Sequence, residues 1–239
     1  MIRLTFLIPV FNEKKTVVEA INQIINLKFS GKEIIIIDNG STDGSQDLIK
    51  KFTKRKNIRI VLRKKNIGYG NSLKQGARMA KGKYMYLHFS DIEYDQNVSI
   101  QMFKIAEKLK ADAIFGSRLK NFSWFQRIAL LQKKPAYVAT FIITFMYNIF
   151  YNKNFTDVIG SKFYKTEIFK KIILKENSLT WSSLDFDLKN KLISGPYKIF
   201  EVFTKYKPRA NNIEKKVKSY HLFLMLLVII RFKLKNLIK

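Results

Sequence analysis

The first half of the chain alternates between short apolar segments and polar, loop-forming segments. The most apolar segment holds four consecutive isoleucines, Ile34 to Ile37, and ends at Asp38. A half-exposed strand would alternate apolar with polar residues, so this segment predicts a strand buried on both faces at the centre of a parallel sheet. A loop rich in Asn, Gly, Ser and Asp follows it, up to Ser45.

The same pattern predicts a series of strands and helices before Arg118. The expected strands cover residues 3–10, 33–38, 58–62, 83–89 and 113–117. Four helices are expected: the first opens at Asn12 and Glu13, the second covers residues 47–55, the third ends near residues 81–82, and the fourth covers residues 98–110. This order is typical of an α/β fold, in which helices flank a mostly parallel central sheet and the crossovers are right-handed.

Two long apolar segments follow Arg118, at residues 135–151 and 220–230. The first is just below the usual length of a membrane-spanning helix, and the second is too short to span. Lys and Arg residues flank the second segment, which either packs on the core as a final helix or lies on a membrane surface. The basic flanks favour the membrane surface. We expect a main domain at 1–217 and a basic, apolar helix at 218–239.

The charge balance is strongly basic, with 45 Lys and Arg against 18 Asp and Glu and a net charge of +27. Such a charge attracts nucleic acid, anionic membranes or phosphorylated substrates. Aromatic residues gather in the apolar segments rather than among basic residues, which argues against nucleic acid as a partner. The chain has no cysteine and two histidines. Disulfides and Cys-ligated zinc are therefore excluded, and a multi-His metal site is disfavoured.

Polar and acidic clusters follow three of the predicted strands: Asn12 with Glu13, Asp38 with Asn39, and Asp91 with Glu93. Because the carboxyl ends of parallel strands meet at one edge of a sheet, these clusters are expected to line one cleft. Two nearby carboxylates suit Mg²⁺ or Mn²⁺ held together with substrate phosphates. The alternative is purely structural, with Asp38 closing a turn and Asp43 or Ser41 capping the next helix.

A glycine-rich segment, residues 66–76, precedes one of the predicted helices. Its glycines, Gly68, Gly70 and Gly76, do not follow the G-x-G-x-x-G spacing, and no Lys-Ser/Thr pair follows them. The segment is therefore a weak match to dinucleotide-binding and P-loop motifs.

Four segments stand in the order seen in family 2 glycosyltransferases with the GT-A fold: 7–13 (Leu-Ile-Pro-Val-Phe-Asn-Glu), 36–45, 66–70 and 91–95. Segments 116–118, 157–164, 201–209 and 214–216 resemble the polyprenyl-phosphate hexosyltransferase branch, which includes dolichyl-phosphate mannose synthases and undecaprenyl-phosphate sugar transferases. The resemblance covers residues 4–217. It implies a Rossmann-like nucleotide-diphospho-sugar transferase fold with C-terminal helical, membrane-proximal elements.

The resemblance implies a role for each matching residue. The residues implied to bind the donor nucleotide are Pro9, Asn12, Glu13, Asp38, Asn39, Gly68 and Lys216. Asp91 and Glu93 would hold the metal, and Arg118 and Arg127 the acceptor phosphate. The residues implied to be catalytic are Asp91, Asp157 and Arg209.

Phe89 departs from the family pattern, because the family places an Asp at that position to form an Asp-x-Asp pair with Asp91. The missing carboxylate weakens the expectation that Mg²⁺ or Mn²⁺ is used, or shifts the metal towards Glu93 and the substrate phosphates. Phe203 likewise stands where the family usually has Pro. A degenerate, non-catalytic transferase domain is therefore one alternative.

The resemblance implies inverting transfer of a hexose from a nucleotide-diphosphate sugar to a polyprenyl phosphate, at the cytoplasmic face of a membrane to which the protein binds peripherally. The alternative acceptor is a hydroxyl group, such as that of a cell-surface polysaccharide. A neutral hydroxyl needs a carboxylate base, for which Asp157, Asp185 and Asp187 are candidates. His88 is expected to be a core residue rather than a ligand, and the apolar N-terminus a core strand rather than a signal peptide.

Overall fold

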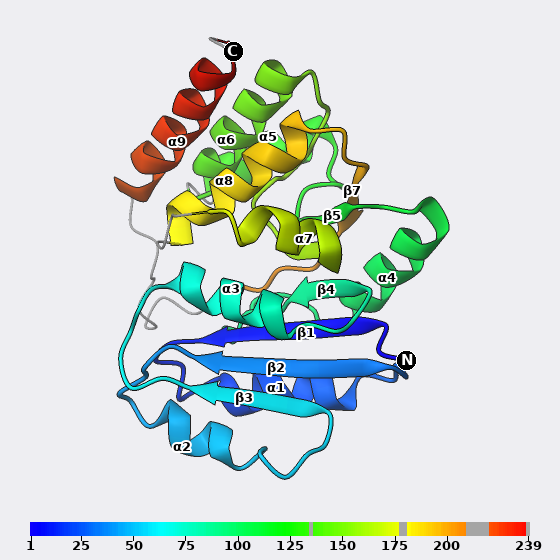
Figure 1. Ribbon diagram of the computed structural model, residues 1–239. Helices are drawn as coiled ribbons and strands as arrows, with labels where there is room; N and C mark the ends of the chain where they lie inside the picture. Colours follow the sequence, from blue (N-terminus) through cyan, green and yellow to red (C-terminus); the bar gives the residue numbers. More distant parts are fainter. Residues whose placement is uncertain (134–135, 177–180, 209–219, 238–239) are drawn as a thin grey trace.

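The computed structural model of the protein describes residues 1–133, 136–176, 181–208 and 220–237 (Figure 1). Its centre is a seven-stranded sheet of order β3-β2-β1-β4-β6-β5-β7. The strands are β1 (Leu4–Val10), β2 (Lys32–Asp38), β3 (Ile58–Leu62), β4 (Tyr84–Leu87), β5 (Ala113–Ser117), β6 (Lys162–Lys165) and β7 (Ile199–Phe203). Strand β6 runs antiparallel to β4 and β5, and the other paired strands are parallel. The predicted mostly parallel α/β sheet is thus confirmed.

Helices cover both faces of the sheet and bury a separate apolar core on each. The helices are α1 (Val17–Asn26), α2 (Ser45–Lys50), α3 (Tyr69–Met79), α4 (Val98–Leu109), α5 (Trp124–Lys133), α6 (Ala136–Tyr151), α7 (Thr166–Ile173), α8 (Trp181–Ser194) and α9 (Tyr220–Leu237). Helices α1, α2 and α4 enclose one core, whereas α3, α6, α7, α8 and α9 contribute to the other.

The four isoleucines of β2 lie between these two cores, as their sequence predicts. Ile34 and Ile36 belong to the core under α1 and α4, and Ile35 and Ile37 belong to the opposite core. All four are fully buried. Successive side chains of a strand point to opposite faces, so only a two-sided core explains an unbroken apolar run. In the register of the sheet, Asp38 pairs with Val10 of β1 and Leu62 of β3.

Two predicted helix boundaries are wrong. The first helix begins at Val17 rather than at Asn12, whose φ of +53° lies in the left-handed region. The backbone N–H groups of Asn12 and Glu13 donate to Ser41 and Ser45 of the neighbouring loop, so this stretch is held as a loop. Helix α2 ends at Lys50 instead of residue 55, and turns follow it.

The region after Arg118 contains elements that the apolar pattern did not predict, including β6, α7 and β7. Helices α6 and α9 correspond to the two apolar segments, and α9 packs against α8 and α6. Within the described residues, every helix is too short or too polar to cross a membrane. The predicted domain boundary at 217/218 lies outside the described residues.

Candidate functional site

The loops that follow β1 and β2 are tied together by hydrogen bonds between side chains and backbone. The Asn12 N–H donates to Ser41 Oγ at 2.9 Å, and Asn12 Oδ1 accepts from the Thr42 N–H at 2.9 Å. The Asp43 carboxylate accepts hydrogen bonds from the N–H groups of Lys14 and of Ser45, the first residue of α2. The polar residues after these strands therefore build one fixed edge, which is where ligands bind in open α/β sheets.

Asp38 is fully buried at this edge, and its two carboxylate oxygens differ in their hydrogen bonding. Its Oδ1 accepts hydrogen bonds from the N–H groups of Gly40 and Ser41, at 3.0 and 2.9 Å, and from Gln46 Nε2 at 2.6 Å. Its Oδ2 is buried and accepts no hydrogen bond from the part of the chain that the structure describes. A buried carboxylate oxygen without a donor is costly, which makes this atom a candidate acceptor for a hydrogen bond from a ligand. The turn-closing alternative accounts for Oδ1 but not for Oδ2.

Arg63 organises the loop between β3 and α3, a role that sequence reasoning missed. Its guanidinium donates to Asn39 Oδ1 at 2.9 Å, to Asn71 O at 3.0 Å and to Gln75 Oε1 at 2.7 Å. Asn39 Nδ2 donates to Asn66 Oδ1 at 2.6 Å, so this carboxamide joins two loops. The predicted nucleotide contact of Asn39 stays a prediction.

Gly68 sits directly before α3 with a φ of +91° and a ψ of 148°. That conformation is open to glycine and strained for other residues. The predicted role of Gly68, letting a ligand approach the backbone, is compatible with this position at the start of a helix. Pro9 lies in β1, next to the strand that carries Asp38.

Asp91 and Glu93 lie in one turn after β4. Asp91 Oδ1 accepts from the Glu93 N–H at 3.3 Å, and Ile92 between them has a φ of +55°. Glu93 Oε2 accepts from the Tyr206 hydroxyl at 3.2 Å. The described residues contain no group of three or more His, Cys, Asp or Glu side chains arranged for a metal. Mg²⁺ is often held by one or two carboxylates plus substrate phosphates, and Asp91 with Glu93 fits that pattern.

His88 is a core residue, as predicted. It is 2% exposed, and its Nε2 lies 3.2 Å from the carbonyl oxygen of Ala20. Burial lowers the pKa of His88 to about 4, so the imidazole is neutral at physiological pH.

Asp157 and Arg118 form a buried ion pair at the end of β5, an arrangement that sequence reasoning did not predict. Arg118 Nε donates to Asp157 Oδ2 at 2.6 Å, and Nη2 donates to Oδ1 at 3.1 Å. Burial alone raises the pKa of Asp157, but the charge and hydrogen bonds of Arg118 and the Ile159 N–H outweigh burial and hold the pKa below its ordinary value. Glu201 of β7 positions the segment by accepting from the N–H groups of Thr156 and Asp157.

The rings of Tyr137 and Tyr206 lie about the same Arg118 guanidinium, with centroids 5.0 and 5.1 Å from its central carbon. The guanidinium thus contacts a carboxylate and two aromatic faces. Arg127, the second predicted phosphate ligand, lies on α5 and donates from Nε to the carbonyl oxygen of Phe122. Arg209 and Lys216 lie outside the described residues.

A second acidic position is Asp185 of α8. Its side chain is 15% exposed and forms an ion pair with the buried Lys189. Tyr69, at the start of α3, lies within electrostatic reach of both carboxylates: burial raises the pKa of its hydroxyl, and the charges of Asp185 and Asp91 raise it further. Helix α8 therefore contacts α3, the helix that begins beside this edge.

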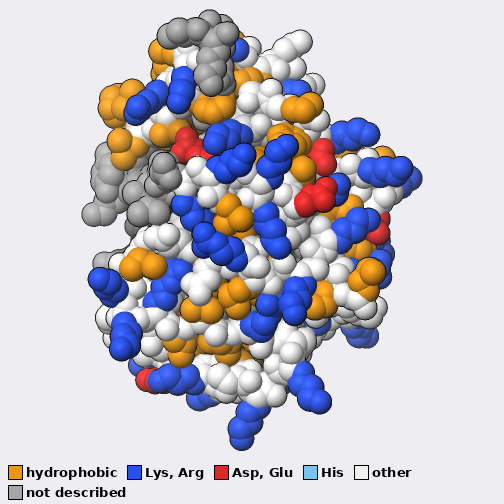
Figure 2. All heavy atoms as spheres, in the orientation of Figure 1, with side chains coloured by type: hydrophobic (Ala, Val, Ile, Leu, Met, Phe, Trp, Pro, Cys, Tyr) orange, Lys and Arg blue, Asp and Glu red, His pale blue; other side chains and the backbone are white. Residues whose placement is uncertain are grey.

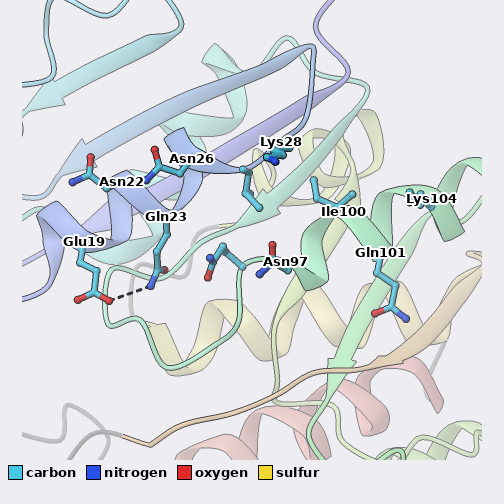
Figure 3. Close-up of a pocket in the computed structure, with 11 residues that line it drawn as sticks. Glu19, Asn22, Gln23, Asn26, Lys28, Asn97, Ile100, Gln101 and Lys104 are labelled. Carbon is cyan, nitrogen blue, oxygen red and sulfur yellow. Dashed lines mark hydrogen bonds between the residues drawn. The ribbon is translucent and has the colours of Figure 1, made fainter.

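A hollow of about 830 Å³ lies between α1 and α4 (Figure 3). Carboxamide side chains dominate its wall: Asn22, Gln23, Asn26, Gln96, Asn97 and Gln101. Within the described chain, its lining includes none of the predicted site residues. The candidate site is therefore the strand edge described above and not this hollow.

Comparison with solved structures shows which proteins share this fold. S. aureus TarS 1-349 in complex with UDP-GlcNAc matches with a TM-score of 0.58 and 12% identity over 98% of this chain and 73% of that chain. Glucosyl-3-phosphoglycerate synthase from Mycobacterium tuberculosis, solved with Mn²⁺, UDP and glucosyl-3-phosphoglycerate, matches with a TM-score of 0.57 and 13% identity over 96% and 79% of the two chains. At these identities the likeness concerns the fold, which is the predicted GT-A fold.

Comparison with curated sequences gives closer relatives. Poly-beta-1,6-N-acetyl-D-glucosamine synthase of Staphylococcus epidermidis is 27% identical over 209 residues, which are 87% of this chain and 48% of that protein. The Staphylococcus aureus (strain COL) enzyme of the same name is 32% identical over 118 residues, 49% of this chain and 28% of that protein. The chain thus spans about half the length of these relatives or less. The family model described as glycosyl transferase family 2 matches residues 5–173, and the chain therefore belongs to glycosyl transferase family 2.

Proposed function

We propose that the protein transfers a sugar from a nucleotide-diphosphate sugar to a hydroxyl group of a growing cell-surface polysaccharide, with inversion at the anomeric carbon. The observation that carries this proposal is the contrast between two acids. Both acids are ion-paired, Asp157 with Arg118 and Asp185 with Lys189, but Asp157 is fully buried whereas the Asp185 side chain is 15% exposed. The charges of Asp185 and Asp91 both act on the hydroxyl of the buried Tyr69. A hydroxyl acceptor needs a carboxylate base within reach, and Asp185 meets that need better than Asp157.

The donor half of the reaction rests on the edge formed by β1, β2 and β4. Asp38 Oδ2 would accept a hydrogen bond from the nucleobase, and Gly68 at the start of α3 would allow a close approach of the ligand to the backbone. Asp91 and Glu93 would hold a divalent cation, which would neutralise the charge of the leaving diphosphate. UDP-GlcNAc is the donor to test first, because a TarS structure holds it and two relatives are named for N-acetylglucosamine polymers.

The transfer itself is a single displacement. The acceptor oxygen forms a bond to the anomeric carbon, and the bond from that carbon to the diphosphate oxygen breaks, with its electron pair leaving on the diphosphate. The acceptor proton passes to the Asp185 carboxylate. Lys189 forms an ion pair with Asp185 one turn away on α8, which fixes the orientation of the base.

A polyprenyl phosphate at a membrane surface is the second candidate acceptor. The net charge of +27 and the apolar helices α6 and α9 favour it. A phosphate is already anionic, so this acceptor would need no base. Against it, the Arg118 guanidinium that would bind the acceptor phosphate is paired with Asp157.

The acceptor class is decided by labelling. Membranes that carry the protein are incubated with a panel of labelled nucleotide sugars and then extracted with organic solvent. The proposal predicts that label from one sugar enters polysaccharide and stays out of the extract. Label in a lipid phosphate that mild acid releases would establish the second candidate instead. No label in either fraction, with the protein folded, would contradict both.

A further inference from the structure

Helices α6 and α9 each have one buried apolar face and one exposed apolar face. On α6, Ile143 and Tyr147 are fully buried. The exposed residues of α6 recur at helical spacing: Val138, Ile142, Phe145 and Ile149, with Phe145 65% exposed. Residues spaced by three or four positions share one side of a helix, so these four form a continuous stripe.

Helix α9 repeats this arrangement beside α6. Met225 and Ile229 are buried, and they belong to the same core cluster as the buried residues of α6. The exposed stripe of α9 has the same spacing: Phe223, Leu227, Ile230 and Leu234, with Phe223 64% exposed. The two helices contact each other and bury their other faces in one core, so each stripe lies on the solvent side of its helix. Figure 1 shows both helices at the same end of the molecule. We call these eight residues the outer stripe.

The charged residues on α5, α6 and α9 are all basic. Helix α6 carries no charged residue, and α9 carries Arg231, Lys233 and Lys235 but no acid. Neighbouring α5 has no acid either, and it exposes Trp124 and Phe125. Figure 2 shows hydrophobic and basic side chains side by side over the part of the surface where α9 lies. An apolar surface bordered by cations complements an anionic lipid surface.

We propose that the outer stripe docks the protein on an anionic lipid bilayer, with the apolar side chains entering the headgroup region and Arg231 and Lys235 contacting lipid phosphates. This goes beyond the proposed transfer reaction, which needs no bilayer. Because none of the described helices is suited to cross a membrane, docking here is interfacial.

The inner side of α6 connects this surface to the site. Thr140 Oγ1 accepts from Arg118 Nη2 at 2.8 Å, and Thr144 Oγ1 accepts from the Val158 N–H at 3.3 Å. The Asn148 carboxamide is hydrogen-bonded to the backbone of Phe155 at both its polar atoms. Thr144 and Asn148 thus fix the segment that carries Asp157 to α6, and Thr140 fixes its partner Arg118. Docking therefore orients that side of the site towards the lipid.

Vesicle co-sedimentation tests this proposal. The probe is vesicles of equimolar phosphatidylcholine and phosphatidylglycerol, with pure phosphatidylcholine vesicles for comparison. The unmodified protein should bind the anionic vesicles, and added salt should weaken the binding. The double variant F145S/F223S should bind at least about tenfold more weakly, because two large apolar side chains are removed from the contact. The matched control, L109S/L174S, removes two exposed leucines from other elements and should bind normally.

The charge variant R231E/K235E should also lose about tenfold in binding to anionic vesicles. Release of UDP from UDP-GlcNAc in the presence of a soluble acceptor should be unchanged in F145S/F223S, which separates docking from the proposed reaction. Equal losses in F145S/F223S and L109S/L174S would overturn the proposal. The proposal would also be overturned if the unmodified protein does not bind anionic vesicles and instead forms a dimer, detected by light scattering, whereas F145S/F223S is monomeric.

Discussion

Removal of the Arg118 guanidinium from the buried pair with Asp157 should cause a large loss of stability. The Arg118 side chain is 10% exposed and Asp157 is fully buried, so solvent cannot replace the lost partner. In Arg118→Leu, Asp157 keeps its burial but loses the two hydrogen bonds from the guanidinium and its counter-charge. The backbone N–H of residue 118, which donates to Asp157 Oδ2, is retained. Breaking a buried ion pair on one side costs about 3–5 kcal/mol.

The effect of pH has a definite sign. In the unmodified protein the pKa of Asp157 lies below its ordinary value, so its contribution to stability is present above the unfolded-state pKa and is lost as the pH falls through the folded-state pKa. In Arg118→Leu, burial dominates and raises the pKa of Asp157, so protonation relieves the buried charge. The gap in unfolding free energy between the two proteins should therefore shrink from pH 7 to pH 4.5.

Urea denaturation at both pH values measures this gap, provided that the dependence of free energy on urea is the same for both proteins. At pH 7 the melting temperature should also fall, on the order of 10 °C for a chain of this size. Arg118→Leu/Asp157→Leu should be more stable than Arg118→Leu alone, since no charge is left buried. A loss of less than about 1 kcal/mol at pH 7, or a gap that does not shrink in acid, would refute the reasoning.

Three other changes have defined outcomes. Asp38→Asn replaces the buried acceptor Oδ2 and should weaken UDP binding about tenfold by calorimetry, with little change in melting temperature; unchanged affinity would remove Asp38 from the nucleotide site. Gly40 has a φ of +78°, and Gly40→Ala would place a Cβ 2.4 Å from the carbonyl carbon of Lys65. Urea denaturation should show that the free energy of unfolding falls by about 1–3 kcal/mol or more. An unchanged free energy of unfolding would contradict the close approach. Burial, with Lys189 nearby, lowers the pKa of Lys162 in the folded protein to about 7. Above that pH the Lys162 side chain therefore binds more protons in the unfolded chain than in the folded protein, and stability rises with pH. The melting temperature of the unmodified protein relative to Lys162→Met should therefore rise from pH 7 to pH 9, and a constant difference would contradict this.

The polar strand edge around Asp38 could be predicted from sequence because its signals are local. The isoleucines of β2 report burial on both faces, and Asp38 follows them directly. The topology of a parallel sheet then places Asp38 beside the polar residues after β1 and β4 without further information. What was missed there is Arg63, which in sequence is one basic residue among many and becomes a loop organiser only through contacts with Asn39, Asn71 and Gln75.

The second half of the chain was predicted less well, for physical reasons. Strand β6 has four residues and lies antiparallel between β4 and β5. The strand–helix–strand alternation that predicts parallel strands therefore does not predict it. Arg118 and Asp157 are 39 positions apart, and nothing in either neighbourhood shows that they pair. Helices α6 and α9 were recognised as apolar, but their division into a core face and an outer face follows from packing against α8 and each other.

The most direct test of the account is sugar transfer by purified protein carrying Asp185→Asn. UDP release and product formation from UDP-GlcNAc are followed with Mn²⁺ and a β-1,6-linked N-acetylglucosamine oligosaccharide, and nucleotide binding is measured separately. Asp47→Asn, which removes an exposed carboxylate on α2, serves as the matched control. The account predicts that Asp185→Asn lowers the turnover rate by about 10²- to 10⁴-fold while UDP still binds, and that the control is active. Full activity in Asp185→Asn, or no turnover by the unmodified folded protein with any nucleotide sugar and acceptor, would contradict it.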